Sequence, residues 1–404
     1  MSRAMLSPEA QLLLACGEID GDEAALRALL ARPVAWDRVM FLAHREKAAP
    51  VLLRRLGELR DANGASLVPP EVLAQLRKLS MVIEFLMLQL RQRLDETVDV
   101  LTRAGIEPVL LKGAALCFTS YGSMAERPMA DIDVLVEAGQ ARRAREILLQ
   151  SGWEWNEAVR RDEDYQDHHH LPPLDDGRGS GVKLEVHTEL FVAGNPFRLS
   201  GDVVRQGSQA VVAGGRRLRV PGRVHQLLHT CLHFAWSHNM RSAAWRAFRD
   251  VGVITRAGFD WEQFAAEARA DRAATCCYWT LRLARELMRV PVPAATLEAL
   301  RPPLPGVVLR RLERHFVTQL LPTEPGCPSI ALEKLLWGVG VMPRWSGHGS
   351  SRPWDEADSL LAKRRQEQPA GAGSGSTSKA MRQLRNLSQW SRYVRAVLAP
   401  VPSK

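Results

Sequence analysis

The stretch from Leu110 to Val136, LLKGAALCFTSYGSMAERPMADIDVLV, decides the fold. It ends in a β-rich run, DIDVLV, at 131–136. Because side chains alternate along a strand, Asp131 and Asp133 point to the same side. Two carboxylates this close repel each other, so burying them without a cation is costly. The residues therefore predict a divalent cation held by oxygen ligands, a chemistry suited to Mg²⁺.

The residues upstream of the two aspartates predict a site for an anion. Residues 107–111 are typical of a short strand, which ends at Lys112 and Gly113. A glycine lets the backbone come close to a ligand, and a helix starting at Ala114 would point N–H groups at an anion. A phosphate site that faces a metal site indicates nucleotide chemistry.

A later strand is expected to supply a third carboxylate. In VKLEVH, residues 182–187, alternation places Glu185 and His187 on one face and the apolar side chains on the other. If the apolar face packs against helices, the polar face lies toward the cleft that holds the two aspartates.

These motifs resemble a known family. A strand, a glycine turn, a helix and a strand bearing D-h-D, where h is apolar, are similar to the polymerase-beta-type nucleotidyltransferase superfamily. The fuller pattern resembles the bacterial group usually called uncharacterised nucleotidyltransferases, and the likeness extends more weakly from about residue 36 to residue 268. The residues that carry it are the LKGAAL segment at 111–116, Tyr121, Arg127, the DIDVLV segment at 131–136 and Glu185 in its E-h-H string.

The resemblance implies an α/β fold, with a small mixed sheet of the nucleotidyltransferase type flanked by N- and C-terminal helices. It implies transfer of a nucleoside monophosphate from a nucleoside triphosphate (NTP) to an acceptor, with Mg²⁺ or Mn²⁺ as cofactor. The acceptor stays open between a small molecule, a protein side chain and an RNA end. The implied metal-binding and catalytic residues are Asp131, Asp133 and Glu185. The implied nucleotide-binding residues are Lys112, Gly113, Ala114 and Arg127.

A second interpretation is a catalytically inactive descendant that serves as a binding or scaffold protein in a biosynthetic or toxin–antitoxin operon. Many active members of the superfamily have Ser after the glycine, where this chain has Ala114. The three retained carboxylates favour an enzyme. A third interpretation is a helical regulatory protein that acts through a basic tail.

Histidines gather at two places. His168, His169 and His170 follow one another in an acidic stretch, which is typical of a solvated loop or of a substrate or metal contact. The second group, His225, His229 and His233, is spaced i, i+4, i+8 on one helix face, without an H-E-x-x-H motif or a cysteine at zinc spacing. That pattern favours packed or cleft histidines over a zinc site. The histidines expected to line the cleft are His170, His187 and His233.

The length of the chain and its distribution of charge predict several structural regions. A chain of 404 residues is expected to form two or three units. Its net charge is +9, but residues 363–404 hold nine Lys and Arg against one Glu, so the body is nearly neutral. A long nucleic-acid footprint on the body is therefore disfavoured. The expected regions are N-terminal helices at 1–105, the catalytic core at 106–222, a helical domain at 223–340, a loop and linker at 341–378, and a basic tail helix at 379–404 that binds an acidic partner.

The remaining patterns concern compartment and burial. The six cysteines show no CxxC spacing, no run is long and apolar enough to span a membrane, and no signal-peptide core is visible, so we expect a cytoplasmic protein. A long helix is expected at 71–104. Its residues 81–90 are apolar nearly all round, which predicts burial on more than one side.

Overall fold

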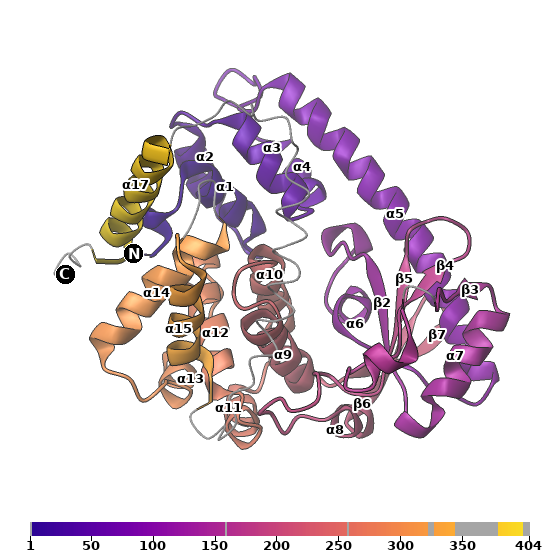
Figure 1. The fold of residues 1–404 in the computed structure, drawn as a ribbon. Coiled ribbons are helices and arrows are strands. Elements are labelled where there is room, and N and C mark those ends of the chain that lie inside the picture. The colour runs from indigo at the N-terminus through magenta and orange to yellow at the C-terminus, as the bar shows by residue number, and fades with distance from the viewer. Residues whose placement is uncertain (1, 158–159, 257, 322–326, 344–378, 399–404) are drawn as a thin grey trace. The chain divides into compact units, whose positions relative to one another are not determined.

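The computed structural model describes residues 2–157, 160–256, 258–321, 327–343 and 379–398 (Figure 1). The chain divides into two compact units. The sheet unit holds residues 40–230 and 250–272, and the helical unit holds residues 1–39, 231–249 and 273–404. Residues 344–378, most of the expected loop and linker, lie outside the described residues.

The sheet unit is built on one mixed seven-stranded sheet in the order β3-β4-β5-β2-β1-β7-β6. The pairs β2–β5 and β1–β7 are parallel, and the other neighbours are antiparallel. The predicted α/β class with a mixed sheet is therefore confirmed. The strands are β1 Val109–Leu110, β2 Asp131–Leu135, β3 Trp153–Glu154, β4 Leu174–Asp176, β5 Lys183–His187, β6 Ser208–Ala213 and β7 Arg216–Pro221.

Apolar side chains on β2 and β5 form the centre of this unit's core. Ile132, Val134, Leu184 and Val186 are buried in one hydrophobic cluster. Helices α5 and α6 contact β2, and α7 contacts β5. The helices of the unit are α4 Ala49–Leu56, α5 Pro70–Arg103, α6 Lys112–Thr119, α7 Ala141–Gln150, α8 Gly201–Gln206 and α11 Trp261–Ala270, together with most of α3 Trp36–Arg45, most of α9 Arg223–Leu232 and the end of α10 Ala244–Ile254.

Helix α5 corrects one expectation. Its middle was predicted to be buried on more than one side, but Met81 and Phe85 are 69% and 60% exposed and Leu88 is exposed too. The helix begins against α4 and ends in the core of the sheet unit, where Leu90 and Leu94 are buried. The apolar residues between these two contacts are left in solvent, because the helix is longer than either surface it packs on.

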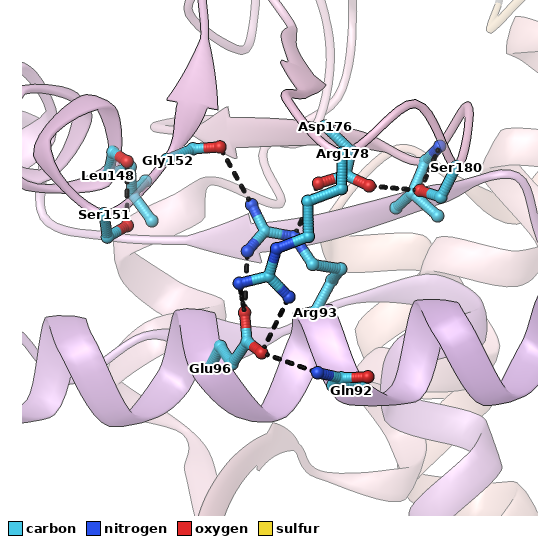
Figure 2. Close-up of polar contacts among 10 residues, drawn as sticks. Gln92, Arg93, Glu96, Leu148, Ser151, Gly152, Asp176, Arg178 and Ser180 are labelled. Carbon is cyan, nitrogen blue, oxygen red and sulfur yellow. Dashed lines mark hydrogen bonds and ion pairs between the residues drawn. The ribbon is translucent and has the colours of Figure 1, made fainter.

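A polar cluster fastens α5 to the outer strands of the sheet (Figure 2). The almost fully buried guanidinium of Arg93 lies 2.8 Å from Asp176 and donates to Glu96 at 2.6 Å. It also stacks over the ring of Trp153, with 4.2 Å between the guanidinium carbon and the ring centroid. Arg178 adds a second ion pair to Glu96 at 2.9 Å. The cluster therefore positions the antiparallel pair of β3 and β4, which extends the sheet beyond β5.

The helical unit packs around tryptophans. Trp279 donates to the carbonyl of Gly340 at 2.8 Å, and Trp337 donates to that of Ala235 at 2.9 Å. A π-helical turn, His233–Ser237, follows α9 in the sequence. The helices are α1 Pro8–Gly17, α2 Glu23–Leu30, α12 Ala274–Met288, α13 Ala294–Ala299, α14 Gly306–Leu320, α15 Ile330–Val341 and α17 Lys379–Leu398, with the start of α10.

In the tail segment, α17 packs on α14 within the helical unit. Tyr393 of α17 places its hydroxyl 2.9 Å from Nδ1 of His315. All six cysteines are free thiols. Among the described residues, no helix combines the length and apolarity needed to cross a bilayer.

Candidate active site

The candidate site lies where β2 and β5 run side by side. Parallel pairing sets Asp133 opposite Glu185, and Leu135 opposite His187. The side chains of Asp133, Glu185 and His187 each offer one ligand atom, and these atoms lie within 4.8 Å of one another. Two strands distant in sequence therefore bring two carboxylates and an imidazole together.

Asp133 is the buried centre of the cluster, with only 3% of its side chain exposed. Its Oδ1 accepts from Nζ of Lys112 and is paired with Nε2 of His187, each at 2.8 Å. Burial alone would raise the pKa of Asp133. The charge of Lys112 and the hydrogen bond from His187 outweigh burial and hold the pKa well below 3.8. Asp133 is therefore an ionised carboxylate with two internal cations.

Glu185 is the more accessible carboxylate, with 18% of its side chain exposed. Its Oε2 lies 3.4 Å from Nε2 of His187 and 3.8 Å from Nε2 of His170. Burial raises the pKa of Glu185, the hydrogen bond with His187 lowers it, and the net effect is a pKa below the ordinary value. Glu185 is thus ionised at neutral pH and open to a ligand.

His187 is completely buried between these two carboxylates. Burial lowers the pKa of its imidazole, but the hydrogen bonds to Asp133 and Glu185 raise it above the ordinary value overall. Lys112 shows the same balance: burial disfavours its charge, and the attraction of the carboxylates raises the pKa of its ammonium group. Both ring nitrogens of His187 face acceptor oxygens, since its Nδ1 lies 3.3 Å from the carbonyl oxygen of Glu189. The cluster therefore pairs two negative charges with two positive ones.

The position of Lys112 depends on an unusual backbone. It begins α6 with a φ of 48°, a left-handed conformation that is uncommon outside glycine. The N–H of Leu111 donates to the carbonyl of Asp133 at 3.0 Å, which fixes the strand end beside β2. The first N–H groups of a helix have no partner within the helix. The predicted anion-binding turn is thus a helix N-terminus whose first side chain reaches the buried aspartate.

Arg127 lies beside Gly113. A Cβ placed on Gly113 would come within 3.3 Å of both Arg127 Nη1 and Met129 Sδ. The guanidinium of Arg127 is oriented by Asp250, to which its Nε donates at 2.7 and 2.9 Å. Tyr121 donates its hydroxyl to the same carboxylate at 2.7 Å. The absence of a side chain at Gly113 therefore leaves space for the guanidinium of Arg127.

Asp250 was not predicted from the sequence. Tyr121 and Arg127 belong to the recognised motif, and a buried arginine requires an anionic partner. That requirement is a signal, but it does not choose among the many acids of the chain, because Asp250 comes from α10, far along the sequence.

Two predicted residues stand apart from the three-residue cluster. Asp131 begins β2 opposite Lys183, is only partly buried, and lies near enough to Lys112 for its charge to raise that ammonium's pKa. Ala114 is buried in the hydrophobic core. Only the backbone of Ala114 is therefore available to a ligand, whereas the side chain of Asp131 reaches solvent.

The histidines that were predicted to line the cleft lie in different surroundings. His170 lies at the edge of the cluster, beside Glu185, and burial lowers its pKa to about 4. His233 belongs to the helical unit, where its ring packs at 4.4 Å against that of His238. His229, a member of the predicted group of packed or cleft histidines, is buried in the sheet unit. Burial and the positive charges of Lys112 and His187 lower its pKa to about 3, so α9 lines the cluster.

Comparison with known proteins gives one match. A family model described as uncharacterised nucleotidyltransferase matches residues 32–289, which is more than half of the chain. No curated protein matches the chain, and no solved structure matches it. The matched residues include every element that contributes to the cluster of Asp133, Glu185 and His187.

Proposed function

This chain belongs to the family of uncharacterised nucleotidyltransferases, and on that premise we propose that it transfers a nucleoside monophosphate from an NTP to a hydroxyl acceptor. The main support is the pairing of Asp133 with Glu185 across two parallel strands, beside a helix N-terminus that carries Lys112. We also propose that the mixed sheet is of the polymerase-beta type, since its D-h-D strand and glycine turn fit that pattern.

The carboxylates fit a hard divalent cation. Asp133 and Glu185 offer oxygen atoms within 4.8 Å of each other, and oxygen donors are what Mg²⁺ and Mn²⁺ prefer. We assign Asp131 to the same site, because it lies on the same side of β2 as Asp133. Bound there, Mg²⁺ or Mn²⁺ would supply positive charge to the triphosphate and to the attacking and leaving oxygens.

The positive groups of the chain bind the phosphates. Lys112 keeps its proton, because the pKa of its ammonium group is raised, so it presents a permanent charge at the start of α6. Arg127 is oriented in advance by Asp250, which reduces the reorganisation needed when charge develops on the phosphates. The backbone N–H groups of Gly113 and Ala114 add the helix N-terminus to this anion site.

Glu185 accepts or orients the proton of the acceptor hydroxyl. It is ionised and is more exposed than Asp133, so it is the carboxylate that reaches an acceptor. The acceptor oxygen forms a bond to the α-phosphorus, the bond from that phosphorus to the bridging oxygen breaks, and pyrophosphate leaves. The hydroxyl proton passes to Glu185, which accepts or orients it.

A second candidate function is a catalytically inactive binding or scaffold protein. One observation favours it: Oδ1 of Asp133 is already shared by Lys112 and His187, so internal cations occupy the position where a metal would bind. A related proposal concerns the tail, whose helix α17 carries Arg392 and Arg395 and is expected to bind an acidic partner.

Transfer of labelled nucleotide separates these functions. Each NTP, labelled at the α-phosphate, is incubated with the full chain, Mg²⁺ or Mn²⁺ and cell extract as the source of acceptor. Asp133→Asn and Glu185→Gln are expected to abolish transfer. Asp202→Asn, which changes an exposed acid on α8, is expected to retain it. Equal transfer by Asp133→Asn would refute the enzyme, and a wild-type chain that binds neither NTP nor metal would support the scaffold.

A further inference from the structure

Three consecutive histidines are fixed beside the end of β5. The carbonyl of His169 accepts from the N–H groups of Thr188 and Glu189, both at 3.0 Å. The N–H of Leu171 donates to the carbonyl of Val186 at 2.9 Å. The backbone that carries the histidines is therefore attached to the sheet, although no strand includes it.

The three side chains converge, unlike consecutive residues of a strand, which alternate. His168, His169 and His170 each offer a ring nitrogen, and the three nitrogens lie within 4.8 Å of one another. The ring centroids of His169 and His170 are 4.6 Å apart, and those of His168 and His170 are 5.5 Å apart. Three imidazoles thus form a cluster that contains no carboxylate of its own.

Two of these rings hold a buried nitrogen without a hydrogen bond. Among the residues that the structure describes, Nδ1 of His168 and Nδ1 of His169 are both buried and have no partner. A buried polar atom without a partner costs about 1–3 kcal/mol. Such atoms in two adjacent rings indicate a ligand that completes their coordination.

The third ring already has the outer hydrogen bond that is common in metal sites. Nδ1 of His170 lies 2.7 Å from the carbonyl oxygen of Leu171. A carbonyl only accepts, so Nδ1 carries the proton and Nε2 carries the lone pair. A ligating histidine usually donates its other N–H to a carbonyl or a carboxylate in this way, which fixes its tautomer.

We propose that His168, His169 and His170 bind one Zn²⁺ ion and leave one coordination position open. Imidazole nitrogen suits zinc, whereas Mg²⁺ prefers oxygen. Zinc–nitrogen bonds of about 2.0–2.1 Å place tetrahedral ligand atoms about 3.3 Å apart. The nitrogens, no more than 4.8 Å apart, reach that spacing by rotation of these partly exposed rings.

The zinc site adjoins the carboxylate cluster but does not depend on nucleotidyl transfer. Nε2 of His170 lies 3.8 Å from Oε2 of Glu185, so the two sites are neighbours that differ in donor type. Nitrogen donors in one and oxygen donors in the other would allow Zn²⁺ and Mg²⁺ to bind separately. An open position on zinc gives a small acceptor or a water molecule a place beside Glu185.

Metal titration of the full chain tests this proposal. Metal is first removed with a chelator, and Zn²⁺ or Co²⁺ is then titrated in the presence of excess Mg²⁺. The wild type is expected to bind one equivalent of Zn²⁺, and bound Co²⁺ is expected to show a spectrum of nitrogen ligation. The triple variant His168→Ala, His169→Ala, His170→Ala should lose more affinity than the roughly 10–100-fold that loss of an outer partner costs.

Two controls locate the metal. His225→Ala removes a histidine of α9 that pairs with Glu267, and Asp133→Asn alters the carboxylate cluster. Both are expected to retain one equivalent of Zn²⁺. Zinc lost in Asp133→Asn but kept in the triple variant would place the ion at the carboxylates and overturn the proposal.

Folding and cysteine ligation are checked separately. If the triple variant does not fold, as judged by circular dichroism, the single variants His168→Gln and His169→Gln are titrated instead. Each is expected to lose affinity for Zn²⁺, and unchanged affinity in both would overturn the proposal. Thiolate charge-transfer bands with Co²⁺ would indicate cysteine ligands and would also overturn the proposal. A wild type that binds no Zn²⁺ would overturn it as well.

Discussion

His187 Nε2 lies 2.8 Å from Asp133 and 3.4 Å from Glu185, so one imidazole bridges two carboxylates on neighbouring strands. The bridge explains how two like charges share a buried position. It also makes the site sensitive to replacement of any one member.

Removing the imidazole bridge is expected to destabilise the fold. His187→Asn leaves two carboxylates with one cation, and breaking a buried pair costs about 3–5 kcal/mol. Urea denaturation measures the loss, with His225→Ala as control. Because a metal can replace the lost charge, Mg²⁺ should stabilise His187→Asn more than the wild type. Equal Mg²⁺ effects would argue against a metal at these carboxylates.

Removing the lysine charge is expected to impair turnover. Lys112→Met deletes a cation from the proposed phosphate site, and loss of one such electrostatic contact typically lowers kcat by about 10²–10³. The rate of labelled-nucleotide transfer measures the effect. Lys78→Met is the matched control, because Lys78 is an exposed lysine on α5. Similar rates for the two variants would remove Lys112 from the site.

Replacing Asp250 is expected to destabilise the fold more than replacing Tyr121. Asp250→Asn leaves the guanidinium of Arg127 without its anion, at a cost of about 3–5 kcal/mol. Tyr121→Phe removes one hydrogen bond to the same carboxylate, at a cost of about 1 kcal/mol. Thermal or urea unfolding of both single variants and of the double variant measures the coupling. Additive losses would show that the three groups do not act together.

The contribution of the polar cluster on α5 to the stability of the fold is expected to depend on pH. The hydrogen bond from Arg178 lowers the pKa of Glu96 to about 2 from an ordinary 4.5, although burial opposes it. Because the folded pKa is the lower one, this contribution to stability is present above pH 4.5 and is lost as the pH falls toward 2. The stability difference between wild type and Glu96→Gln, from urea denaturation, should therefore shrink on acidification. A constant difference would contradict it.

Two positions in one apolar run should respond differently to truncation. Phe85→Ala is expected to change stability by less than about 0.5 kcal/mol, because the ring is exposed. Leu90→Ala is expected to cost about 2–5 kcal/mol, because that side chain is buried. Urea denaturation compares the two. A large loss in Phe85→Ala would mean that another surface covers this part of α5.

Local patterns predicted the elements that carry the site. Alternation placed the strands at 131–136 and 182–187, where β2 and β5 occur, and helical spacing placed α7. The glycine turn and the D-h-D strand also identified the family. Each of these signals lies within a few residues of the element it describes.

Partners that come from distant segments could not be predicted. Asp250 reaches the site only through tertiary packing, and its own neighbours in the sequence give no sign of it. The exposure of Phe85 was missed for a related reason. Hydrophobicity shows that a side chain favours burial, but not whether the fold supplies a surface to cover it.

The left-handed backbone at Lys112 has an energetic consequence. Glycine would adopt that φ without steric penalty, whereas an L-residue there costs roughly 1–2 kcal/mol. A glycine would, however, deprive Asp133 of an ammonium group, and an uncompensated buried carboxylate costs about 3–5 kcal/mol. The cost of removing the charge beside Asp133 exceeds the cost of the strained backbone at Lys112. The chain therefore tolerates the strained turn.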